Sequence, residues 1–256
     1  METAATHRQG EILAALRRAG GSARIQALAT ALAVTDETVR RNIRRLEAEG
    51  LVEKLHGGAR LTEPVAEGDL QSRVREQPEA KRRIADCVAG LIPDGASLFL
   101  DVGSTTAFIA DALRDHRTLT VVTNSVTVAA KLATRNGNRV FFAGGELRAH
   151  DGGSFGVDAL QFIANFQTDF AVMSATAINA EQGFLLFDLE EARFARAIMA
   201  QARSTIVAAD SRKFGRSAPI VVGDPARVSV LVTDDSPPTA VIEAAKHWGT
   251  RIKLAP

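Results

Sequence analysis

Residues 34–46 read VTDETVRRNIRRL, and their pattern predicts the fold of the N-terminal part of the chain. Thr35 suits the N-cap of a helix, and the two carboxylates that follow it favour the positive end of the helix dipole. The apolar residues recur at the i, i+4 and i+7 spacing of one buried helix face: Val39, Ile43 and Leu46. The stretch therefore predicts an amphipathic helix that begins after Thr35 and ends by Gly50.

The opposite face of this helix is basic. It carries four arginines, with two threonines towards its N-terminal end: Arg40, Arg41, Arg44, Arg45, Thr35 and Thr38. Two further helices are predicted over 8–19 and 25–32, and a tight turn at 33–34 joins the second to the arginine helix. This order is typical of a helix-turn-helix, whose second helix enters the DNA major groove, where arginine binds guanine bidentately. The alternative is a solvated arginine face without a ligand.

A short hairpin follows the arginine helix. Residues 51–60 read LVEKLHGGAR, which predicts a strand, a glycine turn and a returning strand, as in the wing of a winged helix. We expect Arg60, and more weakly His56, to contact phosphates or the adjacent minor groove, although the glycines also serve the turn. Residues 1–60 hold ten Lys and Arg against seven Asp and Glu, a net of +3 that suits a polyanion. The predicted organisation is a DNA-binding domain over 1–60 and a linker over 61–78.

Residues 79–256 have a different texture, in which apolar strands alternate with helices. Strands are predicted over 97–102, 119–123, 140–143, 170–174, 205–209 and 228–233. Helices are predicted near 81–91, 105–114, 125–135, 157–166, 188–202 and 238–248. This alternation is typical of an α/β domain with a mostly parallel sheet that helices cover on both faces. We therefore expect a small winged helix-turn-helix and a larger α/β domain.

Polar or glycine-rich clusters follow four of the predicted strands. They are Asp101, Gly103, Ser104, Thr105 and Thr106; Thr123, Asn124 and Ser125; Gly144, Gly145, Glu146 and Arg148; and Lys213. Because the carboxyl ends of parallel strands meet at one edge of a sheet, we expect these residues to converge on one crevice. Helix N-termini and hydroxyls there would hold a phosphate or sugar hydroxyls, and Lys213 or Arg148 would supply a cation. For each cluster alone, an ordinary capped helix or a surface loop is the alternative.

These motifs resemble the DeoR family of sugar-metabolism repressors. The likeness lies in residues 34–43, 51–59, 101–106, 123–125, 144–145 and 210–214, so it covers nearly the whole chain. The resemblance implies a sensor domain related in fold to pentose-phosphate isomerases, a phosphorylated metabolite as inducer, and a homodimer or homotetramer on double-stranded operator DNA. Among phosphorylated polyols and sugars we expect glycerol 3-phosphate first.

Two other functions stay open at this point. An isomerase with an attached head would need a general base, for which Asp101, Glu146 and Asp188 are candidates. An activator is also compatible with the same residues. We expect no cofactor and no metal site, and Cys87 lies in a helical apolar stripe as a buried thiol. The uncharged run 118–130 is too short to span a bilayer, and no secretory signal is visible, so a cytoplasmic protein without a membrane partner is expected.

Overall fold

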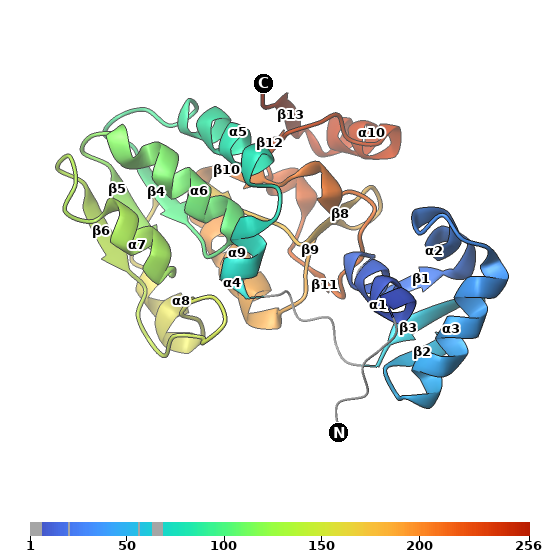
Figure 1. Ribbon diagram of the computed structural model, residues 1–256. Helices are drawn as coiled ribbons and strands as arrows, with labels where there is room; N and C mark the ends of the chain where they lie inside the picture. The colour runs from blue at the N-terminus through green and yellow to red at the C-terminus, as the bar shows by residue number, and fades with distance from the viewer. Residues whose placement is uncertain (1–6, 20, 56, 63–68) are drawn as a thin grey trace. The chain divides into compact units, whose positions relative to one another are not determined.

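The computed structural model describes residues 7–19, 21–55, 57–62 and 69–256. The chain folds into two compact units (Figure 1). The first comprises residues 1–67 and 215–217, and the second comprises residues 68–214 and 218–256. We call residues 7–62 the head and residues 69–256 the body. The range predicted as a linker, 61–78, contains a short helix, α4 (Leu70–Arg75).

The head is a winged helix-turn-helix, as predicted. Its helices and strands are α1 (His7–Arg18), β1 (Ser22–Arg24), α2 (Ile25–Ala31), α3 (Asp36–Ala48), β2 (Val52–Leu55) and β3 (Gly58–Leu61). Thr35 is the N-cap of α3, where its hydroxyl accepts a hydrogen bond from the backbone N–H of Thr38 at 3.3 Å. Aliphatic side chains from the three helices form one buried core, among them Ile12, Leu16, Leu28, Ile43 and Leu46.

The wing has a third strand that the sequence pattern did not predict. β1 pairs antiparallel with β3, so the strand order is β1-β3-β2. A Cβ at Gly58 would lie 2.6 Å from the carbonyl oxygen of Ala23, so this glycine permits close approach of β1. Gly57 has a φ of +78°, which the turn itself requires. The two adjacent glycines therefore serve two different purposes.

The body contains a seven-stranded sheet in which every pairing is parallel. Its strands are β4 (Ser97–Leu100), β5 (Thr120–Thr123), β6 (Arg139–Phe142), β7 (Thr168–Met173), β10 (Ala202–Ala208), β12 (Val230–Thr233) and β13 (Arg251–Leu254). The order across the sheet is β13-β12-β10-β7-β4-β5-β6. From β4 the chain builds outwards through β5 and β6 and then returns to place β7 on the other side. The strand order thus reverses between β4 and β7, which is where open parallel sheets bind ligands.

Helices cover both faces of this sheet, as Figure 1 shows. One face packs against α5 (Pro78–Ala89), α6 (Ser104–Ala112) and α7 (Val126–Leu132), and the other against α8 (Val157–Ile163), α9 (Leu189–Ala200) and α10 (Thr239–Trp248). On β4, Leu98 and Leu100 point to the first face and Phe99 to the second. This alternation fits a strand that is buried on both sides.

Some elements of the body were absent from the sequence prediction. The edge strand β13 follows the predicted last helix, and a small antiparallel sheet forms from β8 (Ala177–Asn179), β9 (Gly183–Leu186) and β11 (Ile220–Val221). Strands β8 and β11 span three and two residues, which are too few for a periodic pattern to identify. Among the described residues, no helix has the length and apolar character needed to cross a membrane.

The central strand offers a test of this packing. Replacing Phe99, which is fully buried, with alanine should lower the free energy of unfolding by about 3–5 kcal/mol, because a cavity remains in the second core layer. Leu254→Ala on the edge strand is the control, since that side chain is 51% exposed. Urea unfolding of the three proteins measures the difference. Equal midpoints for both variants would contradict the assignment of Phe99 to the core.

Candidate functional site

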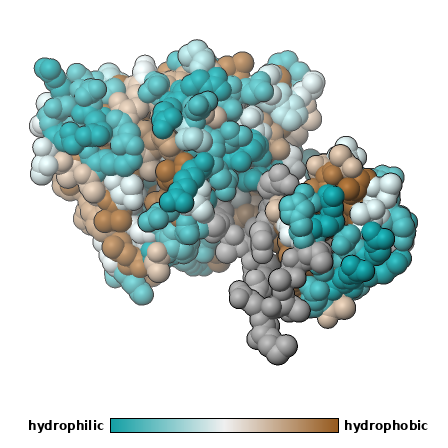
Figure 2. All heavy atoms as spheres, in the orientation of Figure 1, coloured by the Kyte–Doolittle hydropathy of each residue, from teal (hydrophilic) through white to brown (hydrophobic). Residues whose placement is uncertain are grey.

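The face of α3 that the sequence predicts to meet DNA is exposed. Arg40, Arg41, Arg44 and Arg45 are all exposed, whereas Val39, Ile43 and Leu46 on the opposite side are at most 1% exposed. In Figure 2 the surface of the head over α3 is mainly hydrophilic. The guanidinium groups are therefore available to a partner along the whole of this helix face.

The other predicted contacts of the head vary in their surroundings. The hydroxyls of Thr35 and Thr38 lie 3.0 Å apart at the start of α3. Arg60 is exposed on β3 and forms an ion pair with Glu53 across the hairpin, with 2.5 Å between Nη2 and Oε2. His56 lies outside the described residues. Each of the described residues stays a predicted DNA contact.

A hollow of about 390 Å³ lies beside α3 in the head. It is lined by Arg24, Ile25, Gln26, Asp36, Arg40 and Gly57. The hollow lies between the start of α2 and the N-terminal half of α3. In a helix-turn-helix, this half of the second helix approaches the base edges. Arg24 and Gln26 are therefore further candidate DNA contacts. The sequence pattern did not single them out, because they lie at what looks like the start of an ordinary helix.

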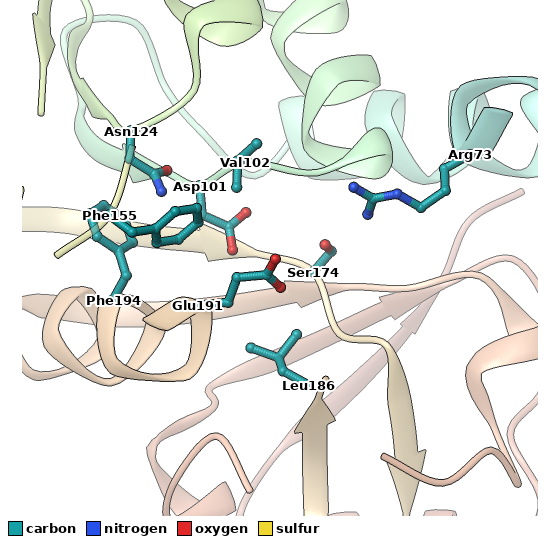
Figure 3. A pocket seen from close by; sticks show the side chains of 9 residues that line it. All are labelled: Arg73, Asp101, Val102, Asn124, Phe155, Ser174, Leu186, Glu191 and Phe194. Carbon is teal, nitrogen blue, oxygen red and sulfur yellow. The ribbon is translucent and has the colours of Figure 1, made fainter. Parts of the chain in front are cut away.

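A pocket in the body lies at the carboxyl edge of the parallel sheet, where the strand order reverses (Figure 3). Asp101 and Val102 follow β4, Asn124 follows β5, and Ser174 follows β7. The remaining walls come from α4, β9, α9 and a loop: Arg73, Leu186, Glu191, Phe194 and Phe155. Figure 3 shows the guanidinium of Arg73 pointing from α4 towards the carboxylates of Asp101 and Glu191.

Two of the predicted effector contacts line this pocket directly, and each carries an acceptor oxygen. Asp101 lies at the tip of β4, and Asn124 is fully buried at the tip of β5. The Nδ2 of Asn124 donates to the carbonyl of Ser154 at 3.2 Å, while its Oδ1 has no hydrogen-bond partner among the described groups. A buried acceptor of this kind suits a hydroxyl donor from a ligand.

Most of the other predicted residues shape the walls. A Cβ on Gly103 would lie 2.8 Å from the hydroxyl of Ser174, so glycine lets the start of α6 approach β7. Gly145 has a φ of +136°, and a Cβ there would lie 2.8 Å from the hydroxyl of Ser154. Hydroxyls in these loops bond to nearby backbone: Thr106 donates to Gly103, Thr123 accepts from Ser125, and Ser125 caps α7. Ser104 and Thr105 are buried in the first turn of α6, and Gly144 precedes Gly145 after β6.

Arg148 contacts carboxylates of the protein itself. Its guanidinium forms ion pairs with Asp151, with Asp188 at 3.3 Å and with Glu191 at 2.5 Å, and it lies 4.0 Å above the ring of Phe155. Burial lowers the pKa of Arg148, but hydrogen bonds to Asp151 and Glu191 outweigh burial, so its pKa is raised. Arg148 thus orients Glu191 and Phe155, which are two walls of the pocket.

The remaining predicted residues lie in loops around the pocket. Glu146 is exposed, and Lys213 ends a 3-10 helix, η2 (Ser211–Lys213), that follows β10. Neither residue is among those that line the pocket. In the part of the chain that the structure describes, no group of three or more His, Cys, Asp or Glu residues could hold a metal ion.

The structure adds pocket residues that the sequence analysis missed. Arg73 fell within the predicted linker, and Glu191 follows Asp188, whose carboxylate caps α9 by accepting from the Glu191 N–H at 2.9 Å. An acidic residue such as Glu191 in the first turn of a helix is explained by its favourable interaction with the helix dipole. Its position in the sequence therefore gave no indication of a binding site. Only the fold brings α4 and α9 to the same crevice.

Comparison with known families agrees with this arrangement of head and body. The model of the DeoR-like helix-turn-helix domain matches residues 8–65, and the model of the DeoR C-terminal sensor domain matches residues 76–235. The chain belongs to the DeoR family. It has the architecture of a DeoR-type transcriptional repressor, with a DNA-binding head and a sensor body.

Several curated relatives of this DeoR-family chain are transcriptional repressors. It is 38% identical to the HTH-type transcriptional repressor CsqR of Escherichia coli K12, over 86% of this chain and 85% of that protein. It is 36% identical to the glycerol-3-phosphate regulon repressor of the same strain, over 86% and 88%. A solved ribose 5-phosphate isomerase A from Methanocaldococcus jannaschii overlaps 54% of this chain and 55% of its own, with a TM-score of 0.40 and 15% identity.

A buried lysine of the DeoR sensor body lies close to Lys213. Lys81 on α5 is 2% exposed, and its Nζ donates to the carbonyl of Arg73 at 2.5 Å. Burial lowers the pKa of Lys81 to about 8, the Asp210 carboxylate opposes this shift, and the ammonium of Lys213 adds to it. Lys81 therefore joins α5 to α4 by a hydrogen bond and lies within electrostatic range of the loop after β10.

The lowered pKa of Lys81 predicts a pH dependence of stability. Above a pH of about 8 the folded lysine loses its proton, while the unfolded lysine keeps it up to about 10.5, so stability should rise with pH between these values. The unmodified protein should gain up to about 3 kcal/mol relative to Lys81→Met across this window. Urea unfolding at pH 7.5, 9 and 10 measures the free energy of unfolding of both proteins. If this free energy changed with pH in the same way in both, the lowered pKa of Lys81 would be contradicted.

Proposed function

We propose that this DeoR-family protein is a cytoplasmic repressor of a carbon-metabolism operon that a phosphorylated metabolite releases from its operator. One observation carries the DNA-binding part of the proposal. α3 presents four exposed arginines on the face opposite its buried stripe, in a helix that a Thr35 cap begins. Arginines spaced along such a helix reach base edges and phosphates of the major groove together.

The operator partner is proposed to be double-stranded DNA with two related half-sites. Helix-turn-helix repressors bind such sites as dimers, and the symmetry of the protein matches that of the site. We therefore propose a homodimer or a homotetramer as the active species. Arg60 on the wing would add contacts to the DNA backbone beside the groove that α3 occupies.

The effector is proposed to be a phosphorylated polyol or sugar. The carboxylate of Asp101 and the amide oxygen of Asn124 would accept hydrogen bonds from its hydroxyls. The first turn of α6, residues 103–106, would hold its phosphate. The 36% identity to glycerol-3-phosphate regulon repressors supports glycerol 3-phosphate as the first compound to test. The 30% identity to the deoxyribose operon repressor of E. coli keeps sugar phosphates in the test panel.

An isomerase activity is the alternative function. Of the three candidate bases, Asp101 lines the pocket, Asp188 caps α9 and pairs with Arg148, and Glu146 is exposed on its loop. Turnover assays on pentose and hexose phosphates separate this alternative from a sensor that binds its ligand unchanged.

The arginine face can be tested with operator DNA selected from a random duplex library by the unmodified protein. Arg40→Ala and Arg41→Ala should each weaken binding to the selected duplex by about 1–3 kcal/mol if the arginine reads a base. Arg135→Ala, an exposed arginine of the body, removes the same charge and should leave operator affinity unchanged. Fluorescence anisotropy at fixed salt gives the affinities. Unchanged binding by both head variants would refute the assignment of α3.

The effector site can be tested by thermal shift. Glycerol 3-phosphate at about 100 times its Kd should stabilise the folded protein by about 2.7 kcal/mol, which raises Tm by roughly 5–10 °C. Asn124→Ala should reduce this rise, because the buried acceptor is lost, whereas Asn165→Ala on the body surface should retain it. Glycerol and inorganic phosphate are the ligand controls. A panel of phosphorylated polyols and sugars that produced no shift would refute an anionic effector.

A further inference from the structure

The pocket in the body contains little free space. Its internal volume is about 10 Å³, enough for roughly one water molecule. Ordinary ligand pockets hold roughly 300–1,000 Å³, and any phosphorylated polyol is much larger than a water molecule. An effector of the proposed class can therefore enter only if part of the wall moves.

The walls differ in how firmly they are held. Asp101, Asn124 and Ser174 follow strands of the buried sheet, and the ring of Phe194 packs edge-on against Phe155 with 6.0 Å between centroids. By contrast, α4 has no buried residue. A short helix without buried apolar side chains opens at a lower free energy than elements of a packed core. Helix α4, which carries Arg73 into the pocket, is thus the wall that yields most easily.

Polar contacts hold α4 against the body at both of its ends. At its start, the N–H of Leu70 donates to the carbonyl of His150 at 2.8 Å. Near its end, the buried Nζ of Lys81 donates to the carbonyl of Arg73, and Glu76 pairs with Arg212 at 3.2 Å. We call the contacts made by Lys81 and Glu76 the α4 latch. Both contacts of the latch can break without opening the hydrophobic core.

A residue in a strained backbone conformation, Gln77, lies between α4 and α5. Gln77 has a φ of +49° and a ψ of 51°, a left-handed conformation that a non-glycine residue adopts at a cost in free energy. Pro78 follows as the first residue of α5, and α5 is anchored in the core by Ile84 and Val88. The strained residue therefore separates a weakly held helix from a firmly held one, and rotation at Gln77 would relieve its strain.

From these observations we propose that α4 is the element through which the effector pocket controls the DNA-binding head. The effector displaces Arg73 and opens the latch, and α4 then moves about Gln77. Because α4 begins only eight residues after the last described residue of the head, Thr62, its movement changes the tether of the head. The inference rests on the proposed function: docked α4 is the operator-binding state, and released α4 is the effector-binding state.

Such coupling has a thermodynamic signature. A variant that weakens the latch raises the population of released α4 before any effector is present. It should therefore bind operator more weakly and effector more tightly, since both ligands bias the same equilibrium. A purely structural defect in the body would weaken effector binding instead of strengthening it.

Two latch variants and two matched controls test the proposal. Lys81→Met removes the bond to the Arg73 carbonyl, and Glu76→Gln removes the ion pair to Arg212. Lys131→Met is the first control, because Lys131 also donates to a backbone carbonyl, that of Ala107 at 2.9 Å, but on α7. Glu243→Gln is the second control and removes a comparable surface ion pair, to Lys246 at 2.8 Å on α10.

Hydrogen exchange of residues 69–77, operator affinity and glycerol 3-phosphate affinity are measured for all five proteins. In the latch variants, exchange should be faster, operator affinity at least about fivefold lower, and glycerol 3-phosphate affinity higher by a similar factor. The controls should match the unmodified protein. Glycerol 3-phosphate itself should accelerate exchange of residues 69–77 in the unmodified protein, whereas glycerol and inorganic phosphate should not.

The outcomes separate this proposal from the function on which it rests. If the unmodified protein selects no DNA sequence, or no compound of the panel binds, the proposed function fails whatever α4 does. If the unmodified protein binds both partners and the latch variants exchange faster with both affinities unchanged, only the coupling through α4 is refuted. Unchanged exchange in both latch variants refutes the latch. Should Lys81→Met fail to fold, Glu76→Gln decides, since the Glu76 side chain is 51% exposed.

Discussion

Parallel pairing of β4 with β7 is the constraint on which the sensor body depends. The two strands are neighbours in the sheet, yet the chain leaves β4 in one direction and reaches β7 only after it has built β5 and β6. The loops that follow β4 and β7 therefore diverge, and a crevice opens above the sheet between them. Asp101, Asn124 and Ser174 reach that crevice because each follows a strand of the same parallel set.

Charge inside the crevice is organised by a few buried contacts. Arg148 binds Asp151, Asp188 and Glu191 together, so an arginine that the sequence suggested for a ligand holds acidic side chains of the protein in place. The cation that points into the pocket is Arg73, which comes from α4 and faces the carboxylates of Asp101 and Glu191 (Figure 3). The pocket thus combines acceptors for hydroxyls with one cation on a weakly held helix.

The structure of the head is explained by the burial of one apolar face on each element. Its core consists of aliphatic side chains from three short helices and the wing, and the four arginines of α3 assigned to DNA lie on the helix face turned away from that core. The buried Asn42 shows how closely α3 is packed, since its Nδ2 donates to the carbonyl of Thr38 at 2.8 Å within the same helix. Arg41, which precedes Asn42, stays exposed because the helical period places it about 100° round the helix, away from the buried face.

Local patterns in the sequence were enough to predict the helix-turn-helix, the wing hairpin and the alternation of strands and helices in the body. They also indicated Asp101 and Asn124 as neighbours, because parallel strands bring their carboxyl ends to one edge. Tertiary structure alone decided which side chains complete the pocket. Arg73 and Glu191 are far apart in the chain and have local explanations as linker and helix start, and their shared crevice depends on how α4 and α9 pack over the sheet. Periodicity records which face of an element is buried, but it does not record which elements meet, and that is why the pocket had to be found in the fold.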